Sequence, residues 1–160
     1  MGVLVIDIGT SGLRAGLVRH DGTLHFLNYE ACRPDTPTPG LVEFDAQKLA
    51  EAALRVCNLT IEQSRKTDKI IAVGITNQRA STVIWSKSTG KPFGPALGWQ
   101  DLRTVGECIT AHAEHGIKLA PNQTATKAAW ILKHYINANK IDHRDVCIGT
   151  VDSFIAATLS

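Results

Sequence analysis

An aspartate that ends an apolar run and precedes a turn of small residues is the feature that most constrains this chain. The run is Val3–Ile6, the carboxylate is Asp7, and the turn Gly9–Gly12 leads into a second apolar segment that contains Arg14. Two strands joined by such a short turn form a β-hairpin. The pattern therefore predicts a fold built on a sheet whose first hairpin carries Asp7 and Arg14 at its turn.

The residue types in this turn suit a site for a metal and the phosphates of a nucleotide. A carboxylate held at a strand end, Asp7, can hold Mg²⁺ directly or through water. Gly9 lets the backbone approach an anion, and the hydroxyls of Thr10 and Ser11 can donate to phosphate oxygens. Arg14 adds a planar cation that suits phosphate. By itself the octapeptide also fits a tight hairpin whose Asp and Gly serve only the turn.

The rest of the pattern predicts an α/β protein. Strands are expected at 3–7, 13–19, 23–30, 70–75, 81–86 and 146–148, and helices at 46–64, 102–115, 126–137 and 153–159. The run 70–75 is continuously apolar, which is typical of a strand buried on both faces. Asp45 and Asp152 are expected to cap the first and last of these helices. The order of elements predicts a mixed sheet with helices on its faces.

Composition indicates a globular protein and argues against two classes of partner. The chain has 160 residues, of which 44% are hydrophobic and 20% charged. A net charge of +2 does not favour nucleic acid, and no uncharged apolar run is long enough to suit a membrane. The four cysteines are far apart and form no C-x-x-C pair, so reduced thiols are expected. With no signal-peptide pattern at the start, we expect a cytoplasmic protein.

Two further clusters carry groups that suit a hydroxylated ligand. Asn77, Gln78 and Arg79 lie between two predicted strands, where they place donors and acceptors in one small volume. Trp99 can pack its ring against the C–H face of a carbon chain, and Asp101 follows it. Each cluster has a structural alternative. The first can be a solvent-facing polar loop, and the second can place Trp99 in the core with Asp101 as a helix cap.

Taken in order, these motifs resemble the FGGY carbohydrate kinases, and the glycerol-kinase-like branch is the nearest. The resemblance covers nearly all of the chain and is carried by Asp7–Ser11 with Arg14, Gly74–Arg79, Trp85–Pro92, Trp99–Thr104, Thr126–Lys127 and Gly149–Ser153. It implies an actin-like, ribonuclease-H-type lobe with a mixed sheet and flanking helices. It also implies ATP and Mg²⁺ as cofactors, and a small sugar or polyol as the partner that accepts the γ-phosphoryl group.

The resemblance assigns roles to particular residues. Asp7 would serve the metal, and Gly9, Thr10, Ser11 and Arg14 would serve the phosphates of ATP.

For the substrate, Arg79 and Trp99 match positions that contact glycerol in glycerol kinases, and Gln78 also fits the pattern of pentulose kinases. Ala80 and Asp101 complete the expected substrate site. Glycerol kinases have Glu where this chain has Ala80, and a tyrosine of their pocket is replaced near Asn122. Losing an acceptor and an aromatic wall frees volume, so we expect a substrate larger than glycerol.

The resemblance also implies parts that residues 1–160 do not contain. The catalytic base of the family is an aspartate beyond Ser160, and a second lobe binds adenosine, so we expect a truncated, partial N-terminal (sugar-binding) domain without the C-terminal ATP-binding domain. The chain alone is expected to be inactive and to expose apolar surface that favours self-association, for example as a homodimer. The alternative function is a non-catalytic sugar-binding or regulatory module of the same fold.

Overall fold

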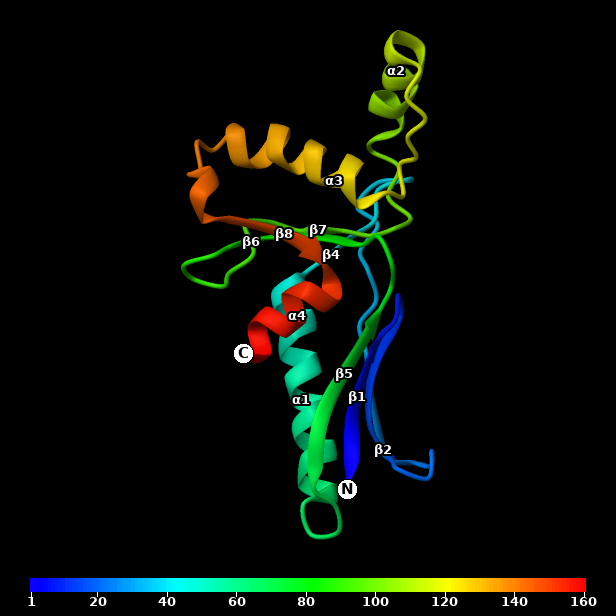
Figure 1. Ribbon diagram of the computed structural model, residues 1–160. Coiled ribbons are helices and arrows are strands. Elements are labelled where there is room, and N and C mark those ends of the chain that lie inside the picture. Colours follow the sequence, from blue (N-terminus) through cyan, green and yellow to red (C-terminus); the bar gives the residue numbers. More distant parts are fainter.

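The computed structural model describes residues 1–160 and contains two four-stranded sheets with helices between and around them (Figure 1). The strands are β1 (Gly2–Ile8), β2 (Gly12–Arg19), β3 (Leu24–Ala31), β4 (Glu43–Phe44), β5 (Ile70–Asn77), β6 (Thr82–Ser86), β7 (Ala96–Leu97) and β8 (Val146–Thr150). The helices are α1 (Ala46–Ser64), α2 (Val105–His115), α3 (Thr124–Ile131), the π-helical η1 (Leu132–Asn137), the short 3₁₀ helix η2 (His143–Asp145) and α4 (Val151–Leu159). None of these helices is long and apolar enough to cross a membrane.

The first sheet has the strand order β3-β2-β1-β5 and is mixed, as the sequence predicts. β1 pairs antiparallel with β2, and Asp7 lies opposite Arg14 in this hairpin. β5 returns after α1 and pairs parallel with β1, which places Asn77 beside Ile8. The C-terminal ends of these two parallel strands therefore meet at one edge of the sheet.

The second sheet has the order β4-β7-β6-β8 and is antiparallel throughout. α3 and η1 pack on one of its faces through Ile131 and Ile136, which contact Ile84 and Leu97. α4 packs on the opposite face, where Phe154 meets Trp85 edge to face. This division into two sheets did not follow from the sequence, which predicted one mixed sheet.

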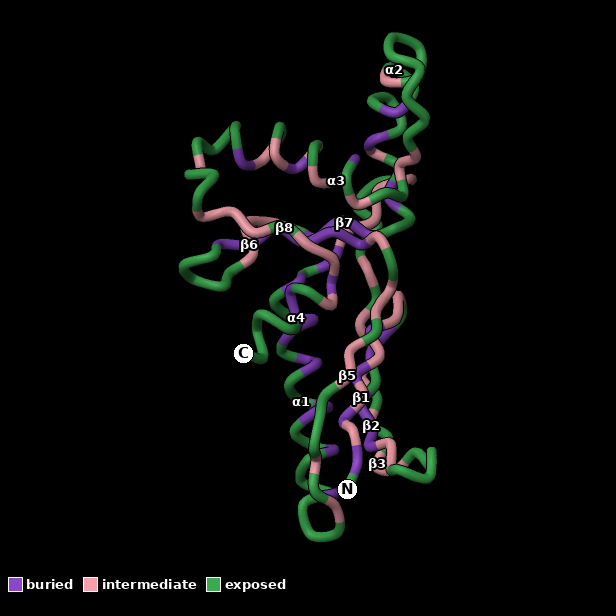
Figure 2. Tube along the Cα trace, viewed as in Figure 1, coloured by how far each residue is buried: buried purple, intermediate pink, exposed green.

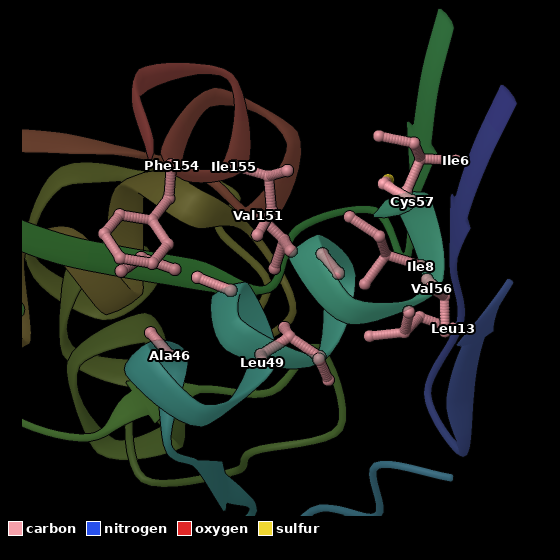
Figure 3. Packing of buried hydrophobic residues seen from close by; sticks show 14 of the residues in the cluster. Ile6, Ile8, Leu13, Ala46, Leu49, Val56, Cys57, Val151, Phe154 and Ile155 are labelled. Atoms are coloured by element: carbon pink, nitrogen blue, oxygen red, sulfur yellow. The ribbon is translucent and has the colours of Figure 1, made fainter. Parts of the chain in front are cut away.

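The main core lies where α1 and α4 fill the space between the two sheets (Figure 3). β1 contributes Ile6 and Ile8, whose side chains share the inner face of the first sheet with Leu13 of β2. The apolar stripe predicted for α1 supplies further members, including Leu49 and Val56. α1 and α4 therefore bury one face of the first sheet, which holds β1 and β5 in place (Figure 2).

β5 is not buried on both faces, so that prediction was wrong. It forms the edge of the first sheet and pairs only with β1. Ile71 and Val73 are 60% and 53% exposed. α4 contacts β5 but leaves these two apolar side chains uncovered, as the exposed tube of β5 shows in Figure 2.

Three helices start at other residues than predicted. α2 begins at Val105 and not at Leu102, since Asp101 accepts hydrogen bonds from the backbone N–H groups of Val42 and Arg103. The helix predicted to start at Thr126 starts at Thr124, and its last six residues, 132–137, are π-helical. α4 begins one residue before Asp152, so Asp152 lies inside its first turn and does not cap it. The Asp45 cap of α1 and the Gly116 end of α2 are confirmed.

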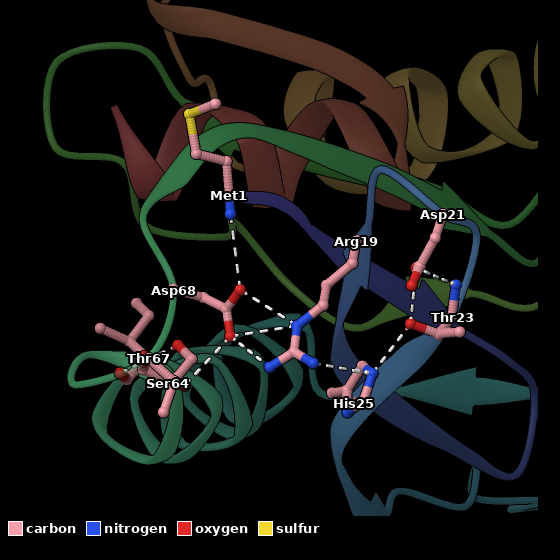
Figure 4. Close-up of polar contacts among 9 residues, drawn as sticks. Met1, Arg19, Asp21, Thr23, His25, Ser64, Thr67 and Asp68 are labelled. Atoms are coloured by element: carbon pink, nitrogen blue, oxygen red, sulfur yellow. Dashed lines mark hydrogen bonds and ion pairs between the residues drawn. The ribbon is translucent and has the colours of Figure 1, made fainter.

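The Asp68 carboxylate ties the start of β5 to the far end of the β2 strand (Figure 4). The guanidinium of Arg19 donates to it at 2.6 and 3.0 Å, and Thr67 adds a hydroxyl donor at 3.0 Å. The N-terminal ammonium of Met1 lies 3.5 Å away. Led by the hydrogen bonds of Arg19, these contacts lower the pKa of Asp68 from its ordinary 3.8 to about 2 despite burial.

This lowered pKa predicts an acid-dependent loss of stability. The folded protein binds the Asp68 proton more weakly than the unfolded chain does, so the carboxylate stabilises the fold above about pH 4, and that contribution disappears as the pH falls towards 2. The Asp68→Asn variant should be less stable than wild type at neutral pH and should lose less stability on acidification. Urea unfolding between pH 6 and 2.5 measures this, and parallel curves for the two proteins would contradict it.

Candidate functional site

A hollow of about 810 Å³ lies at the edge where β1 and β5 end. Segments far apart in the sequence meet there. The lining residues are Asp7, Ile8, Gly9, Thr10, Asn77, Gln78, Arg79, Ala80, Trp99, Asn122, Gln123 and Thr124. The structure thus brings the hairpin turn together with most of the residues predicted to bind substrate.

The hairpin turn forms the first wall of the hollow. Its backbone closes through a hydrogen bond from the Gly9 N–H to the Gly12 carbonyl at 2.9 Å. A Cβ atom at Gly12 would lie 2.6 Å from the carbonyl oxygen of Glu30, so β3 can approach the turn only because this residue is glycine. Ser11 and Arg14 are exposed beside the turn and do not line the hollow.

The two charges of the turn are close to each other. Arg14 NH1 lies 3.5 Å from Asp7 Oδ2, and both side chains are about half exposed. The Arg14 guanidinium also lies over the Tyr29 ring, 5.1 Å from its centroid. Both charges therefore face water and share one long contact, so both can be redirected to a ligand at little desolvation cost.

The residues after β5 form the second wall. The Gln78 N–H donates to the Ile8 carbonyl at 2.7 Å, which fixes this segment against β1. Arg79 is exposed and takes part in no ion pair. Ala80 has φ of 64°, a left-handed conformation that L residues adopt with strain and that recurs at binding sites. The Oδ1 atom of Asn77 is buried without a hydrogen-bond partner.

Trp99 connects the two walls. Its indole Nε1 donates to Thr10 Oγ1 at 3.1 Å, and its backbone N–H donates to Ser81 Oγ at 3.0 Å. The side chain is 40% exposed, so the alternative that places Trp99 in the core is wrong. The Trp99 side chain is therefore accessible from the hollow while its Nε1 atom is fixed by Thr10.

Asp101 lies outside the hollow and is almost fully buried. Its carboxylate accepts from the Val42 N–H at 2.7 Å and from Arg103 Nε and NH2 at 2.7 and 2.8 Å. Arg103 also pairs with Glu43 at 2.7 Å and lies over the Trp130 ring. Burial opposes the charge on Asp101, but the hydrogen bonds of Arg103 and Val42 hold the pKa of this carboxyl below its ordinary value. Its predicted contact with substrate stays a prediction.

Gln123 and Thr124 complete the third wall and were not among the predicted site residues. Asn122 and Gln123 directly precede α3, and Thr124 is its first residue. The Gln123 N–H donates to the Ala120 carbonyl at 3.1 Å. The sequence shows only a polar run, Asn122–Thr124, ahead of a helix. That pattern is shared by many helix starts, so it did not single these residues out.

A smaller hollow of about 380 Å³ adjoins the first at Thr10 and Gln78. Its lining is rich in charge, but the cation Arg55 is paired with Glu30 at 2.6 Å. Arg33 lines the smaller hollow without an ion pair, as Arg79 does in the larger one. The larger hollow is the better candidate because it joins the hairpin turn to the segment after β5 and to Trp99.

No cluster of three or more His, Cys, Asp or Glu side chains exists that would hold a metal by itself. Asp7 is the single carboxylate in the lining of the larger hollow. Mg²⁺ usually keeps several waters and binds through one or two carboxylates together with phosphate oxygens. A half-exposed Asp7 beside hydroxyl and amide donors fits a magnesium ion that arrives with a nucleotide, and it does not fit a permanent metal centre.

The fold and the hollow define a class of protein: an actin-like N-terminal lobe with an open site where two parallel strands end. Residues 2–160 match the N-terminal domain of the FGGY family of carbohydrate kinases. The chain belongs to this family.

Known relatives agree with this assignment. A glycerol kinase of Trichlorobacter lovleyi is 37% identical over 169 residues, which cover 99% of this chain and 34% of that protein. The structure of Plasmodium falciparum glycerol kinase with ADP superimposes with a TM-score of 0.85 at 22% identity, over 96% of this chain and 33% of that one. Xylulose kinase from Rhodospirillum rubrum gives a TM-score of 0.82 at 20% identity, over 99% and 34%. The chain thus spans about a third of the length of the relatives it matches.

Proposed function

We propose that residues 1–160 form the sugar-binding part of an ATP-dependent carbohydrate kinase, and that the site for adenosine is supplied by residues outside this range. The observation that carries the proposal is the larger hollow, which joins the hairpin turn to the Arg79 segment through the Trp99–Thr10 hydrogen bond. A kinase needs phosphate and acceptor hydroxyl side by side, since phosphoryl transfer depends mainly on positioning and charge stabilisation.

In this proposal the hairpin turn serves the phosphates. Asp7 would hold Mg²⁺, which neutralises charge on the phosphate oxygens when it is bound. The Thr10 hydroxyl accepts from Trp99, so its own proton remains free to be donated to a phosphate oxygen. Gly9 and Ser11 add backbone and hydroxyl donors, and Arg14 can leave Asp7 to pair with phosphate.

The remaining walls serve the sugar or polyol. Arg79 and Gln78 offer donors to its hydroxyl groups, and the exposed face of Trp99 packs against its C–H groups. Ala80 carries only a methyl group at the position where glycerol kinases have Glu. Asn122 is smaller than the tyrosine that they have near this position. We therefore propose a substrate larger than glycerol, such as a longer polyol or a ketose.

We also propose that the 160-residue chain by itself has no kinase activity. Transfer needs a group that takes the proton of the acceptor hydroxyl. The single carboxylate that lines the hollow, Asp7, is assigned to the metal and lies 3.5 Å from Arg14. We propose that the base is an aspartate outside residues 1–160, as the family resemblance implies.

A binding panel tests this function. Purified protein is titrated calorimetrically with glycerol, xylitol and xylulose, and ADP formation is followed with each of them in the presence of Mg-ATP. We expect xylitol or xylulose to bind more tightly than glycerol, with no ADP formation above background. Failure of all three to bind would contradict the sugar site. Tighter binding of glycerol would contradict the larger substrate, and sugar-dependent ADP formation would contradict the external base.

A further inference from the structure

Lys127 of α3 is the largest fully buried side chain in the protein, with 0% of its surface exposed. Its ammonium makes no ion pair, and its Nζ donates to the backbone carbonyl of Pro121 at 3.0 Å. Burying a cation without a bound carboxylate costs free energy, and apolar side chains of similar length would fill the same volume without that cost. We therefore expect the hydrogen bond from Lys127 to Pro121 to have a role that an apolar side chain could not perform.

The Pro121 carbonyl is held by more than one donor. The hydroxyls of Thr104 and Thr126 lie 3.4 and 3.5 Å from the same oxygen. The single hydroxyl proton of Thr126 has its shortest contact with the Gln123 carbonyl at 2.8 Å, and the Ala120 carbonyl lies 3.2 Å away as an alternative acceptor. Thr104, Thr126 and Lys127 therefore hold the backbone of residues 120–123 through buried side-chain contacts.

The pinned segment is the third wall of the larger hollow. Asn122, Gln123 and Thr124 face the hollow, whereas Lys127 does not line it. Burial lowers the pKa of Lys127, and the negative charge of nearby Asp101 opposes that shift. The Asp101 carboxylate, two residues after Trp99 in the chain, itself binds the Val42 N–H and the Arg103 guanidinium. Of these two buried charges, Lys127 is the one that bonds directly to the segment of the third wall.

We propose that Lys127 is a positioning residue for the ligand site: by holding the Pro121 carbonyl it fixes the 120–124 wall, and this wall sets which sugar or polyol the hollow accepts. The inference rests on the proposed function for the identity of the ligand. The role of Lys127 in holding residues 120–124 does not depend on the proposed function, because the contacts of Lys127 exist in the ligand-free protein.

The test replaces Lys127 with methionine, which keeps an unbranched chain of similar length and removes the donor. Backbone amide exchange of the ligand-free protein is followed at Gln123 and, as an internal control, at Ile6 in the core strand. We expect faster exchange at Gln123 with no change at Ile6. Thr126→Val removes a second donor to the same segment and should act in the same direction if Lys127→Met does not fold.

Xylitol binding supplies the second readout. Lys127→Met should weaken it about tenfold or more, because hydrogen bonds from charged donors are among the stronger ones. In an Asn122→Ala background the same substitution should cost much less, since the wall through which it acts is already altered. Full additivity of the two substitutions, or unchanged exchange at Gln123, would overturn the proposal. If wild type binds no polyol or ketose, the proposed function fails while the exchange experiment still decides the role of Lys127.

Discussion

The Arg79→Ala variant is expected to bind the sugar or polyol about 10- to 100-fold more weakly than wild type. A hydrogen bond from a charged donor contributes about 1.5–3 kcal/mol, which corresponds to this range of affinity. Arg79 lies two residues after the end of β5, lines the larger hollow and has no ion pair to satisfy within the protein. Its donors are therefore free for a ligand, and the fold should not depend on them.

Calorimetric titration with xylulose or xylitol measures the loss, and thermal unfolding shows whether the variant keeps its fold. Arg65→Ala is the matched control, because Arg65 is an exposed arginine at the end of α1 and does not line the hollow. Arg79→Lys should recover part of the affinity, since it keeps the charge but not the planar fork. Equal affinities for Arg79→Ala and Arg65→Ala would show that Arg79 does not contact the ligand.

The Phe154→Ala variant is expected to lose about 3–5 kcal/mol of unfolding free energy. Phe154 is 1% exposed and packs edge to face on Trp85, with ring centroids 5.4 Å apart. It belongs to the core cluster that also contains Ala46 and Leu49 of α1 (Figure 3). Removing the ring leaves a cavity between the two sheets, and a loss of this size is a large share of the about 5–15 kcal/mol typical of a folded domain.

Urea unfolding at neutral pH measures this loss. Ala156→Ser changes an exposed position of the same helix and should stay within about 0.5 kcal/mol of wild type. Phe154→Leu keeps most of the apolar volume and should fall between the two. A Phe154→Ala protein as stable as Ala156→Ser would mean that α4 does not hold the two sheets together.

Local patterns predicted the elements that depend on neighbouring residues. The hairpin of β1 and β2 and the Asp45 cap of α1 follow from residues close together in sequence, and both are confirmed. The second sheet could not be predicted, since β4 and β7 have two residues each and show no alternation. The apolar run of β5 looks the same in a central strand and in an edge strand, so its exposure depended on how far α4 reaches.

The candidate site was predicted where its residues belong to an ordered series of motifs. Asp7, Gly9, Thr10, Arg79 and Trp99 were named from the sequence and meet in one hollow. Contacts between distant side chains and backbone carbonyls have no local signature. The sequence therefore revealed neither the burial of Asp101 against Val42 nor the bond from Lys127 to Pro121.

The hydrogen bond between the Trp99 indole and the Thr10 hydroxyl joins residues 89 positions apart. A hydroxyl that accepts one hydrogen bond becomes a better donor of its own proton, so in the proposed site Trp99 would strengthen the bond from Thr10 to a phosphate oxygen. Coupling free energies are reciprocal, so phosphate bound at Thr10 would change the affinity of the Trp99 side for its proposed ligand by the same factor. In the proposed site, a ligand on one side of the hollow would thereby affect binding on the other side through the hydroxyl group of Thr10.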